Sequence, residues 1–196
     1  MREKSMAKRS PHMMRVTGGM YRGRRVRCPP GVIRPTMDRM RESLFAIMGD
    51  LTGRSFLDLF SGSGIVGIEA ASRGAEPVIL IERDRWKKAV ILENIGFVGS
   101  VINLRIQPVR QFIRRNREGY DIIFADPPYV MKDKRGLLRE IEESGTLKSD
   151  GLLIIHLPRQ EIPESRIGTY HLSDRRIYGG STLAFYRIGQ PDPPEA

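Results

Sequence analysis

The sequence contains little of what disulfide-bonded, metal-binding or membrane-spanning proteins require. Its 196 residues include a single cysteine, Cys28, which excludes an internal disulfide bond. Three scattered histidines, His12, His156 and His171, form no recognisable set of metal ligands with that cysteine. No apolar run approaches the roughly 18 residues of a membrane span, and the N-terminus lacks a signal peptide's apolar core. We therefore expect a metal-free protein in a reducing, cytoplasmic setting, with no membrane partner and a monomeric state by default.

Basic residues are plentiful but unevenly distributed. Residues 1–41 contain 12 of the 33 Lys and Arg residues and two of the 23 acids, so they account for the whole net charge of +10. Segregation of this kind favours an arm that binds a polyanion. Residues 1–12 show no periodicity and are expected to form a disordered basic tail. A second disordered tail, polar and rich in proline, is expected at 189–196.

The basic segment changes character after Pro11. Short alternating stretches around Gly18-Gly19 predict a β-hairpin over residues 13–33, with one face rich in arginine. A helix is predicted to begin near Thr36, as its N-cap. The predicted phosphate contacts are Arg22, Arg24, Arg25, Arg27, Arg34 and Arg39. For the last two, pairing with acids on the helix surface is an equally open alternative.

Beyond this helix, strands alternate with helices. The predicted strands are "SFLDLF", "PVILIE", "VINLRI", "YDIIFAD" and "GLLIIHL", and the predicted helices lie at 64–72, 85–97, 109–116 and 134–143. A final hairpin around Gly179-Gly180 would add an antiparallel strand to the sheet. The pattern predicts an α/β domain over residues 34–188, with a doubly wound, mostly parallel, seven-stranded sheet covered by helices on both faces.

The loop after the first of these strands carries a chemical signal. In "LDLFSGSGIVGIEAASRGA", Gly62, Gly64 and Gly67 follow the pattern G-x-G-x-x-G, which lets the backbone approach a ligand at a helix N-terminus. Glu82 ends the next strand and is suited to bind ribose hydroxyls. A dinucleotide would place its pyrophosphate in this loop, whereas S-adenosylmethionine needs an acid before it to pair with an ammonium group. Asp58 is such an acid and favours S-adenosylmethionine.

A second signal, "DIIFADPPYV", ends the fourth strand. In a doubly wound sheet, the first and fourth strands flank the switch point, so Asp126 should face the glycine loop across one crevice. The Asp126 carboxylate and the Pro127 carbonyl could accept the hydrogens of an exocyclic base amine. Pro127 and Pro128 stiffen the loop, and the ring of Tyr129 could stack on a flipped or unpaired base.

Six segments, taken in order and with their spacing, resemble the small bacterial methyltransferases that modify a guanine N2 in 16S ribosomal RNA. The segments are "RVTGGMYRGRRV", "RPTMDRMRESLF", "DLFSGSGIVGIEAASRGA", "LIERD", "IIFADPPY" and "YGGSTLAFY". The resemblance covers residues 14–188. The glycine loop and the Asp-Pro-Pro-Tyr element occur in many methyltransferases, whereas "RPTMDRMRE" leading into "FSGSG" and "EAASRGA" is much more specific.

The resemblance implies a Rossmann-like class I methyltransferase that converts S-adenosyl-L-methionine to S-adenosyl-L-homocysteine. The implied substrate is 16S rRNA in the small ribosomal subunit or its assembly intermediate, modified at the N2 of guanine 966. The N-terminal hairpin would grip the RNA. The implied catalytic residues are Asp126, Pro127, Pro128 and Tyr129. The predicted cofactor contacts are Asp58, Phe60, Gly62, Gly64, Glu82, Arg83, Gln107, Val109 and Asp126.

Two positions depart from the family pattern. Relatives end the third strand with Asp or Asn, which accepts a hydrogen bond from the cofactor's adenine amine, but here Pro108 stands near that place. Gln107 or the backbone around Val109 could substitute for the missing acceptor. His156 stands at the end of the fifth strand, where many relatives have an acid. We interpret it as an ordinary, partly exposed strand-end histidine rather than a residue of the active site.

Other functions remain as alternatives. An adenine-N6 methyltransferase of DNA or RNA would use the same Asp-Pro-Pro-Tyr chemistry, although DNA enzymes normally need an added domain to read a sequence. A non-catalytic RNA-binding assembly factor should have lost Asp126 or the glycine loop, and this chain has both. A NAD-dependent enzyme is disfavoured because no hydride-transfer residue accompanies the loop.

Overall fold

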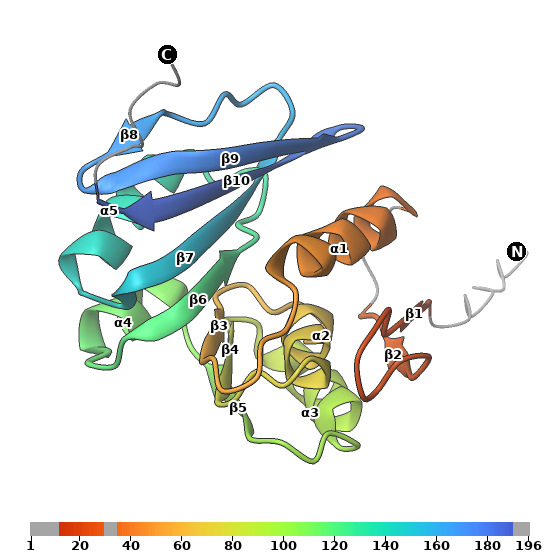
Figure 1. The fold of residues 1–196 in the computed structure, drawn as a ribbon. Helices are drawn as coiled ribbons and strands as arrows, with labels where there is room; N and C mark the ends of the chain where they lie inside the picture. Colours follow the sequence, from red (N-terminus) through yellow and green to blue (C-terminus); the bar gives the residue numbers. More distant parts are fainter. Residues whose placement is uncertain (1–11, 30–34, 190–196) are drawn as a thin grey trace, which may run out of the picture.

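The computed structural model describes residues 12–29 and 35–189, and its centre is an eight-stranded sheet with helices on both faces (Figure 1). The order of the strands across the sheet is β5-β4-β3-β6-β7-β10-β9-β8. Their bounds are β3 Phe56–Asp58, β4 Val78–Glu82, β5 Ile102–Ile106, β6 Tyr120–Ala125, β7 Leu147–Pro158, β8 Arg166–Ile167, β9 Tyr170–Tyr178 and β10 Ser181–Ile188. The first five strands in this order, from β5 through β4, β3 and β6 to β7, run parallel. The last three, β10, β9 and β8, join by antiparallel pairing.

This topology confirms the predicted doubly wound sheet. Strand order reverses between β3 and β6, which pair in parallel with Leu57 opposite Ile123. All seven predicted strands are present, and the two-residue strand β8 adds an eighth at the edge. The reversal places the loops after β3 and β6 side by side at the carboxyl ends of the strands, where ligands bind in sheets of this kind.

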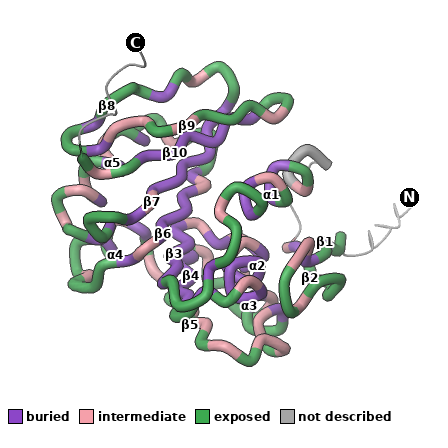
Figure 2. Tube along the Cα trace, in the orientation of Figure 1, coloured by how far each residue is buried: buried purple, intermediate pink, exposed green. Residues whose placement is uncertain are grey.

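The helices divide between the two faces of the sheet (Figure 1). The bounds are α1 Pro35–Met48, α2 Ile65–Ser72, the 3-10 turn η1 Arg85–Lys87, α3 Lys88–Ile95, α4 Val109–Arg115 and α5 Lys134–Glu143. One core lies between the sheet and α1, α2 and α3, around Leu44, Phe56 and Leu80. The other lies against α4 and α5, around Ile113 and Leu137. Burial on both faces explains the continuous apolar runs of the central strands, which are drawn as buried in Figure 2.

The predicted N-terminal hairpin is present and packs on the outer side of α2 and α3. Its strands are β1, Met13–Arg15, and β2, Arg25–Arg27, which pair antiparallel. Val16 and Val26 are fully buried against Ile65 and Ile68 of α2. The alternation of β2 points Arg25 and Arg27 outward while Val26 points inward, which gives the arginine-rich face that the sequence predicts.

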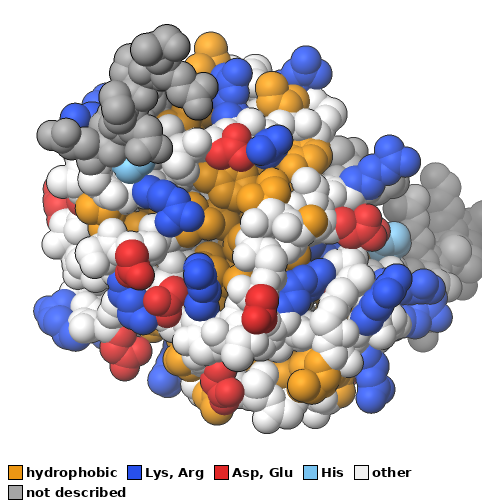
Figure 3. All heavy atoms as spheres, in the orientation of Figure 1, with side chains coloured by type: hydrophobic (Ala, Val, Ile, Leu, Met, Phe, Trp, Pro, Cys, Tyr) orange, Lys and Arg blue, Asp and Glu red, His pale blue; other side chains and the backbone are white. Residues whose placement is uncertain are grey.

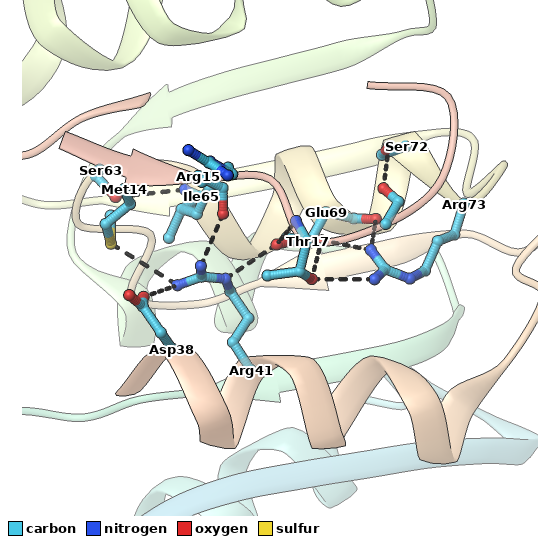
Figure 4. A network of polar contacts seen from close by, with 11 residues as sticks. Met14, Arg15, Thr17, Asp38, Arg41, Ser63, Ile65, Glu69, Ser72 and Arg73 are labelled. Atoms are coloured by element: carbon cyan, nitrogen blue, oxygen red, sulfur yellow. Dashed lines mark hydrogen bonds and ion pairs between the residues drawn. The ribbon is translucent and has the colours of Figure 1, made fainter. Parts of the chain in front are cut away.

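A buried acid holds the hairpin to the rest of the molecule (Figure 4). Glu69 of α2 is fully buried and accepts hydrogen bonds from the backbone N–H and the hydroxyl of Thr17, at 2.7 and 2.9 Å. The same carboxylate pairs with Arg41 of α1, at 3.0 Å, and with Arg73. Since a buried charge needs such partners, the network links the hairpin, α1 and α2 rigidly.

Several expectations concern residues beyond these ranges. The predicted tails at 1–12 and 189–196 lie outside the described residues, except for His12 and Gly189, and so does Arg34. Within the described parts of the chain, no helix is long and apolar enough to cross a membrane. No group of three or more potential metal ligands occurs within those same parts.

Candidate active site

A pocket of about 710 Å³ lies at the carboxyl ends of β3, β4, β6 and β7. Nine of the residues predicted for the site line it, namely Phe60, Gly62, Glu82, Arg83, Val109, Asp126, Pro127, Pro128 and Tyr129. The structure thus brings the glycine loop and the Asp-Pro-Pro-Tyr element together in one cavity. The lining does not include the other three predicted residues, Asp58, Gly64 and Gln107.

The glycine loop has a backbone that other residues rarely adopt. Gly62 and Gly64 have φ angles of 57° and 82°, and Gly64 is the N-cap of α2. The loop is held by hydrogen bonds from Ser61 N to the Ile81 carbonyl, at 3.0 Å, and from Gly62 N to the Glu82 carboxylate, at 3.0 Å. Two positive φ angles within three residues explain the need for glycine at both positions.

Asp58 is a buried carboxyl group that pairs with no cation among the described residues. It is 1% exposed, and its Oδ1 accepts one long hydrogen bond, 3.4 Å, from Phe60 N. Its Oδ2 is buried and has no hydrogen-bond partner among the described residues. Burial raises the pKa of Asp58 to about 8, with a further contribution from the negative charges of Asp126 and Glu82. An ammonium group beside Oδ2 would satisfy this acid, which fits the amino-acid end of S-adenosylmethionine.

Glu82 forms part of the pocket wall at the end of β4. Its Oε1 accepts a hydrogen bond from Asp84 N, at 2.9 Å, and its Oε2 accepts from Gly62 N and from Lys87 Nζ, at 3.0 and 3.1 Å. These bonds fix a carboxylate that is 6% exposed at the side of the glycine loop. Because Oε1 accepts only the bond from Asp84 N, it retains a lone pair that can accept from a ribose hydroxyl.

The Asp-Pro-Pro-Tyr element follows β6 directly, as predicted. Asp126 is 28% exposed into the pocket, and Tyr129 is 44% exposed at its rim. Met131 N donates to the Pro128 carbonyl, at 2.8 Å, which closes a turn after the two prolines. The carboxylate of Asp126 is therefore carried on a short, stiff loop opposite the glycine loop.

The prediction for His156 was wrong. This residue of β7 is 2% exposed rather than partly exposed, and it lines the same pocket. Its Nδ1 lies 2.6 Å from Oδ1 of Asp126. The pairing of Ala125 with Ile155 in the adjacent parallel strands brings the next residue of each strand together. His156 is thus a neighbour of the proposed catalytic acid, which sequence reasoning missed.

The segment that follows β5, the third strand of the predicted domain, contributes no acidic side chain to the pocket lining, as its sequence predicts. Pro108, Val109 and Arg110 line the pocket at this side. The N–H of Gln107 donates to the Glu82 carbonyl, at 3.0 Å, so the backbone of Gln107 is part of the β4–β5 pairing. Of the two predicted substitutes for the missing acceptor, only Val109 therefore contributes to the cavity lining.

The five predicted phosphate contacts that lie within the described residues are on the hairpin and α1, and none of them lines the pocket. Arg22, Arg24, Arg25, Arg27 and Arg39 are all exposed. Arg24 lies over the ring of Phe97, 5.3 Å from its centroid, and Arg27 pairs with Glu93 at 3.5 Å. Figure 3 shows Lys and Arg side chains on the side of the molecule where Figure 1 places α1 and the hairpin.

One further contact joins the hairpin to the glycine loop. Asn94 of α3 is 4% exposed and accepts a hydrogen bond from Arg27 N, at 2.9 Å. Its Nδ2 donates to the carbonyls of Arg27 and Ser63, both at 2.8 Å. The position of β2 is therefore set relative to the cofactor loop. Nothing in the local sequence around Asn94 predicts this bridge.

Comparison with known proteins places the chain in a family. The model of the family described as Conserved hypothetical protein 95 matches residues 14–187. Ribosomal RNA small subunit methyltransferase D of Escherichia coli K12 is 35% identical over 151 residues, which is 72% of this chain and 73% of that protein. The chain belongs to this methyltransferase D family. YlbH of Bacillus subtilis 168 is 32% identical over 182 residues, which is 89% of this chain and 98% of that one.

A solved structure agrees with this membership of the methyltransferase D family. The structure of yhhF from Escherichia coli matches with a TM-score of 0.82 and 27% identity, covering 90% of this chain and 98% of that chain. The agreement extends over the sheet and its helices, so the fold is that of a Rossmann-like methyltransferase. The protein is an S-adenosyl-L-methionine-dependent ribosomal RNA methyltransferase.

Proposed function

We propose that the protein methylates the exocyclic N2 amine of a guanine in 16S rRNA, at guanine 966, with S-adenosyl-L-methionine as methyl donor. Its substrate would be the small ribosomal subunit or an assembly intermediate, and its compartment the cytoplasm. The observation that carries the proposal is the position of Asp126, exposed in the pocket wall opposite the glycine loop. The relatives named above, together with the similarity of the motifs, support the choice of RNA as substrate.

The chemistry requires a nucleophile to be prepared and aligned. The lone pair of an exocyclic guanine amine is shared with the ring, so the amine is a weak nucleophile. One oxygen of Asp126 and the carbonyl of Pro127 would accept its two hydrogens and favour a pyramidal nitrogen. When bound, S-adenosyl-L-methionine supplies a methyl group on an electrophilic sulfonium. The main task of the pocket residues is then to hold the nitrogen in line with that methyl group, and Asp126 would take up the proton that the nitrogen releases.

The cofactor would be held by the residues behind and beside the glycine loop. The unpaired Oδ2 of Asp58 would receive its ammonium group, and Glu82 would accept from its ribose hydroxyls. Gly62 and Gly64 allow close approach of the backbone between these two acids. The remaining part of the cofactor would be bordered by Phe60, Arg83 and Val109, the last of which is the first residue of α4.

The target base and the RNA around it would be bound by separate parts of the surface. The ring of Tyr129, at the pocket rim, would stack on the guanine, a contact that contributes about 1–3 kcal/mol. The exposed arginines of the hairpin would bind phosphates and fix the orientation of the RNA without reading its sequence. Because Glu69 and Asn94 dock the hairpin firmly, these arginines stand at a fixed position relative to the pocket.

The product identifies the function. Small-subunit particles that lack the modification are incubated with the protein and labelled S-adenosyl-L-methionine, and the RNA is digested to nucleosides for mass spectrometry. We expect the label in N2-methylguanosine. Label in N6-methyladenosine would assign the chain to the adenine-N6 alternative, and particles bound without any transfer would indicate an assembly factor.

A further inference from the structure

His156 is buried beside Asp126, and the proposed function gives it no role. They lie at the same level of two adjacent parallel strands, β7 and β6, with Nδ1 and Oδ1 2.6 Å apart. His156 is 2% exposed, whereas Asp126 is 28% exposed and lines the pocket. We propose that His156 is a positioning residue that fixes the Asp126 carboxylate for methyl transfer. The inference rests on the proposed role of Asp126 in that reaction.

The surroundings of the imidazole select its tautomer. Nε2 of His156 is buried and has no hydrogen-bond partner among the described residues. A charged imidazolium would leave an N–H of a cation unsatisfied at this atom, which is more costly than leaving a neutral acceptor unpaired. The neutral ring with its proton on Nδ1 therefore fits the site. It donates that proton to Oδ1 of Asp126, which remains a carboxylate.

This hydrogen bond separates the roles of the two carboxylate oxygens. Oδ1 is engaged by His156, so Oδ2 is the oxygen that remains for the amine of the base. Pro127 and Pro128 fix the backbone after Asp126, but they do not fix the rotation of its side chain. A donor of fixed position on β7 supplies that restraint. Since a misplacement of about 1 Å can reduce a rate about 100-fold, the restraint bears directly on turnover.

The imidazole also contacts the other residue that faces the base. The rings of His156 and Tyr129 meet edge to face, with centroids 5.9 Å apart and planes at 63°. His156 is itself held in the middle of the sheet, because Leu183 of β10 pairs with it from the other side. One rigid side chain, His156, therefore positions the Asp126 carboxylate and borders the Tyr129 ring. The base amine would lie between these two groups.

Three substitutions separate this role from simple packing. The substitution His156→Leu removes the Nδ1–H donor and retains much of the volume of the side chain. Asparagine in His156→Asn keeps an N–H near the place of Nδ1, whereas glutamine in His156→Gln carries its amide farther out, near the place of Nε2. Thermal unfolding of each variant reports folding. Methyl transfer to undermodified particles is measured at varied RNA and cofactor concentrations, so that kcat and KM are obtained separately.

We expect His156→Leu and His156→Gln to lower kcat about 10- to 100-fold, with KM for the cofactor within about twofold of the native value. His156→Asn should recover most of the lost kcat. Equal impairment of the asparagine and glutamine variants, or native turnover in both, would overturn the inference. The comparison of these two polar variants remains decisive if the leucine variant does not fold.

A measurement without substrate tests the pair independently of the proposed function. Nitrogen-15 NMR of the His156 ring should show a protonated Nδ1 and an unprotonated Nε2 at pH 8, and a changed Nδ1 signal in Asp126→Ala. The opposite tautomer would refute the inference even if the native protein methylates its substrate. Conversely, a native protein that makes no N2-methylguanosine but shows this tautomer would refute the proposed function alone.

Discussion

Binding of S-adenosyl-L-methionine should release a proton from Asp58. This carboxyl group is 1% exposed, and its burial, reinforced by the charges of Asp126 and Glu82, raises its pKa to about 8. At pH 7 a group with this pKa is about 90% protonated. The ammonium group of the cofactor, placed beside Oδ2, favours the ionised form and lowers the pKa. Binding at pH 7, where the cofactor's amine is itself mostly protonated, should therefore release most of one proton.

The pH dependence of the affinity follows from the same linkage. Below pH 8 the cofactor must displace a proton from Asp58, so its association constant should rise about tenfold per pH unit between pH 6 and pH 7.5. Above pH 8 the carboxyl group is already ionised in the free protein, while the cofactor's α-amino group, with an ordinary pKa of about 8, loses its charge, so the affinity should fall again.

Unlike the affinity for the cofactor, the free energy of unfolding of the cofactor-free protein should fall as the pH rises. The pKa of Asp58 is higher in the folded state than its ordinary value of 3.8, so between about pH 4 and pH 8 the folded state holds a proton that the unfolded chain has lost. This group therefore stabilises the fold most below pH 4. Its contribution falls as the pH rises to 8, by up to about 1.4 kcal/mol per pH unit.

Calorimetry tests this linkage directly. Titrations at pH 7 in two buffers with different ionisation enthalpies give the number of protons released, and a pH series gives the association constant. Asp58→Asn is the matched control, because an amide of the same shape cannot titrate; it should bind weakly, without proton release. An affinity that is unchanged from pH 6 to pH 8, together with no proton release in the native protein, would refute the placement of the ammonium group at Asp58.

Two further predictions concern the hairpin. Charge reversal of Arg24 and Arg25 should weaken binding to RNA and reduce the slope of log K against log salt by roughly 2. The same change at the control positions Arg114 and Arg115, on α4, should leave the slope unaltered. Equal effects of the two changes in filter binding would refute a role for the hairpin. Glu69→Gln removes the buried carboxylate shared by Arg41, which also pairs with Asp38, and the half-buried Arg73. The free energy of unfolding should therefore fall by about 3 kcal/mol in urea titrations, and a loss below about 0.5 kcal/mol would contradict the anchoring role.

Much of the fold could be predicted because local patterns and topology agree. The apolar runs of β4 and β6, the glycines at 62 and 64 and the acid-proline-proline sequence after β6 each specify a local structure. The alternation of strands and helices then specifies a doubly wound sheet, which brings the loops after β3 and β6 together without any knowledge of side-chain contacts.

The contacts that the sequence did not reveal are those between side chains of different elements. His156 could be placed at a strand end, but its burial beside Asp126 depends on the register of β6 and β7, which shifts between Tyr120 and Ile122. A register shift has no signature in either strand alone. Glu69 did carry a signal, because an acid in the otherwise apolar helix "IVGIEAAS" calls for buried partners. The identity of those partners, Thr17, Arg41 and Arg73, depends on how three separate segments pack.

The most direct test of the account maps the methyl group on the RNA. Undermodified small-subunit particles are treated with the native protein or with Asp126→Asn, and the 16S rRNA is cut into fragments for mass spectrometry. The native protein should add one methyl group, to the N2 of a single guanine, guanine 966. The Asp126→Asn protein should bind S-adenosyl-L-methionine yet transfer about 100-fold more slowly. A methyl group on an adenine, or native turnover by the Asp126→Asn protein, would contradict the account.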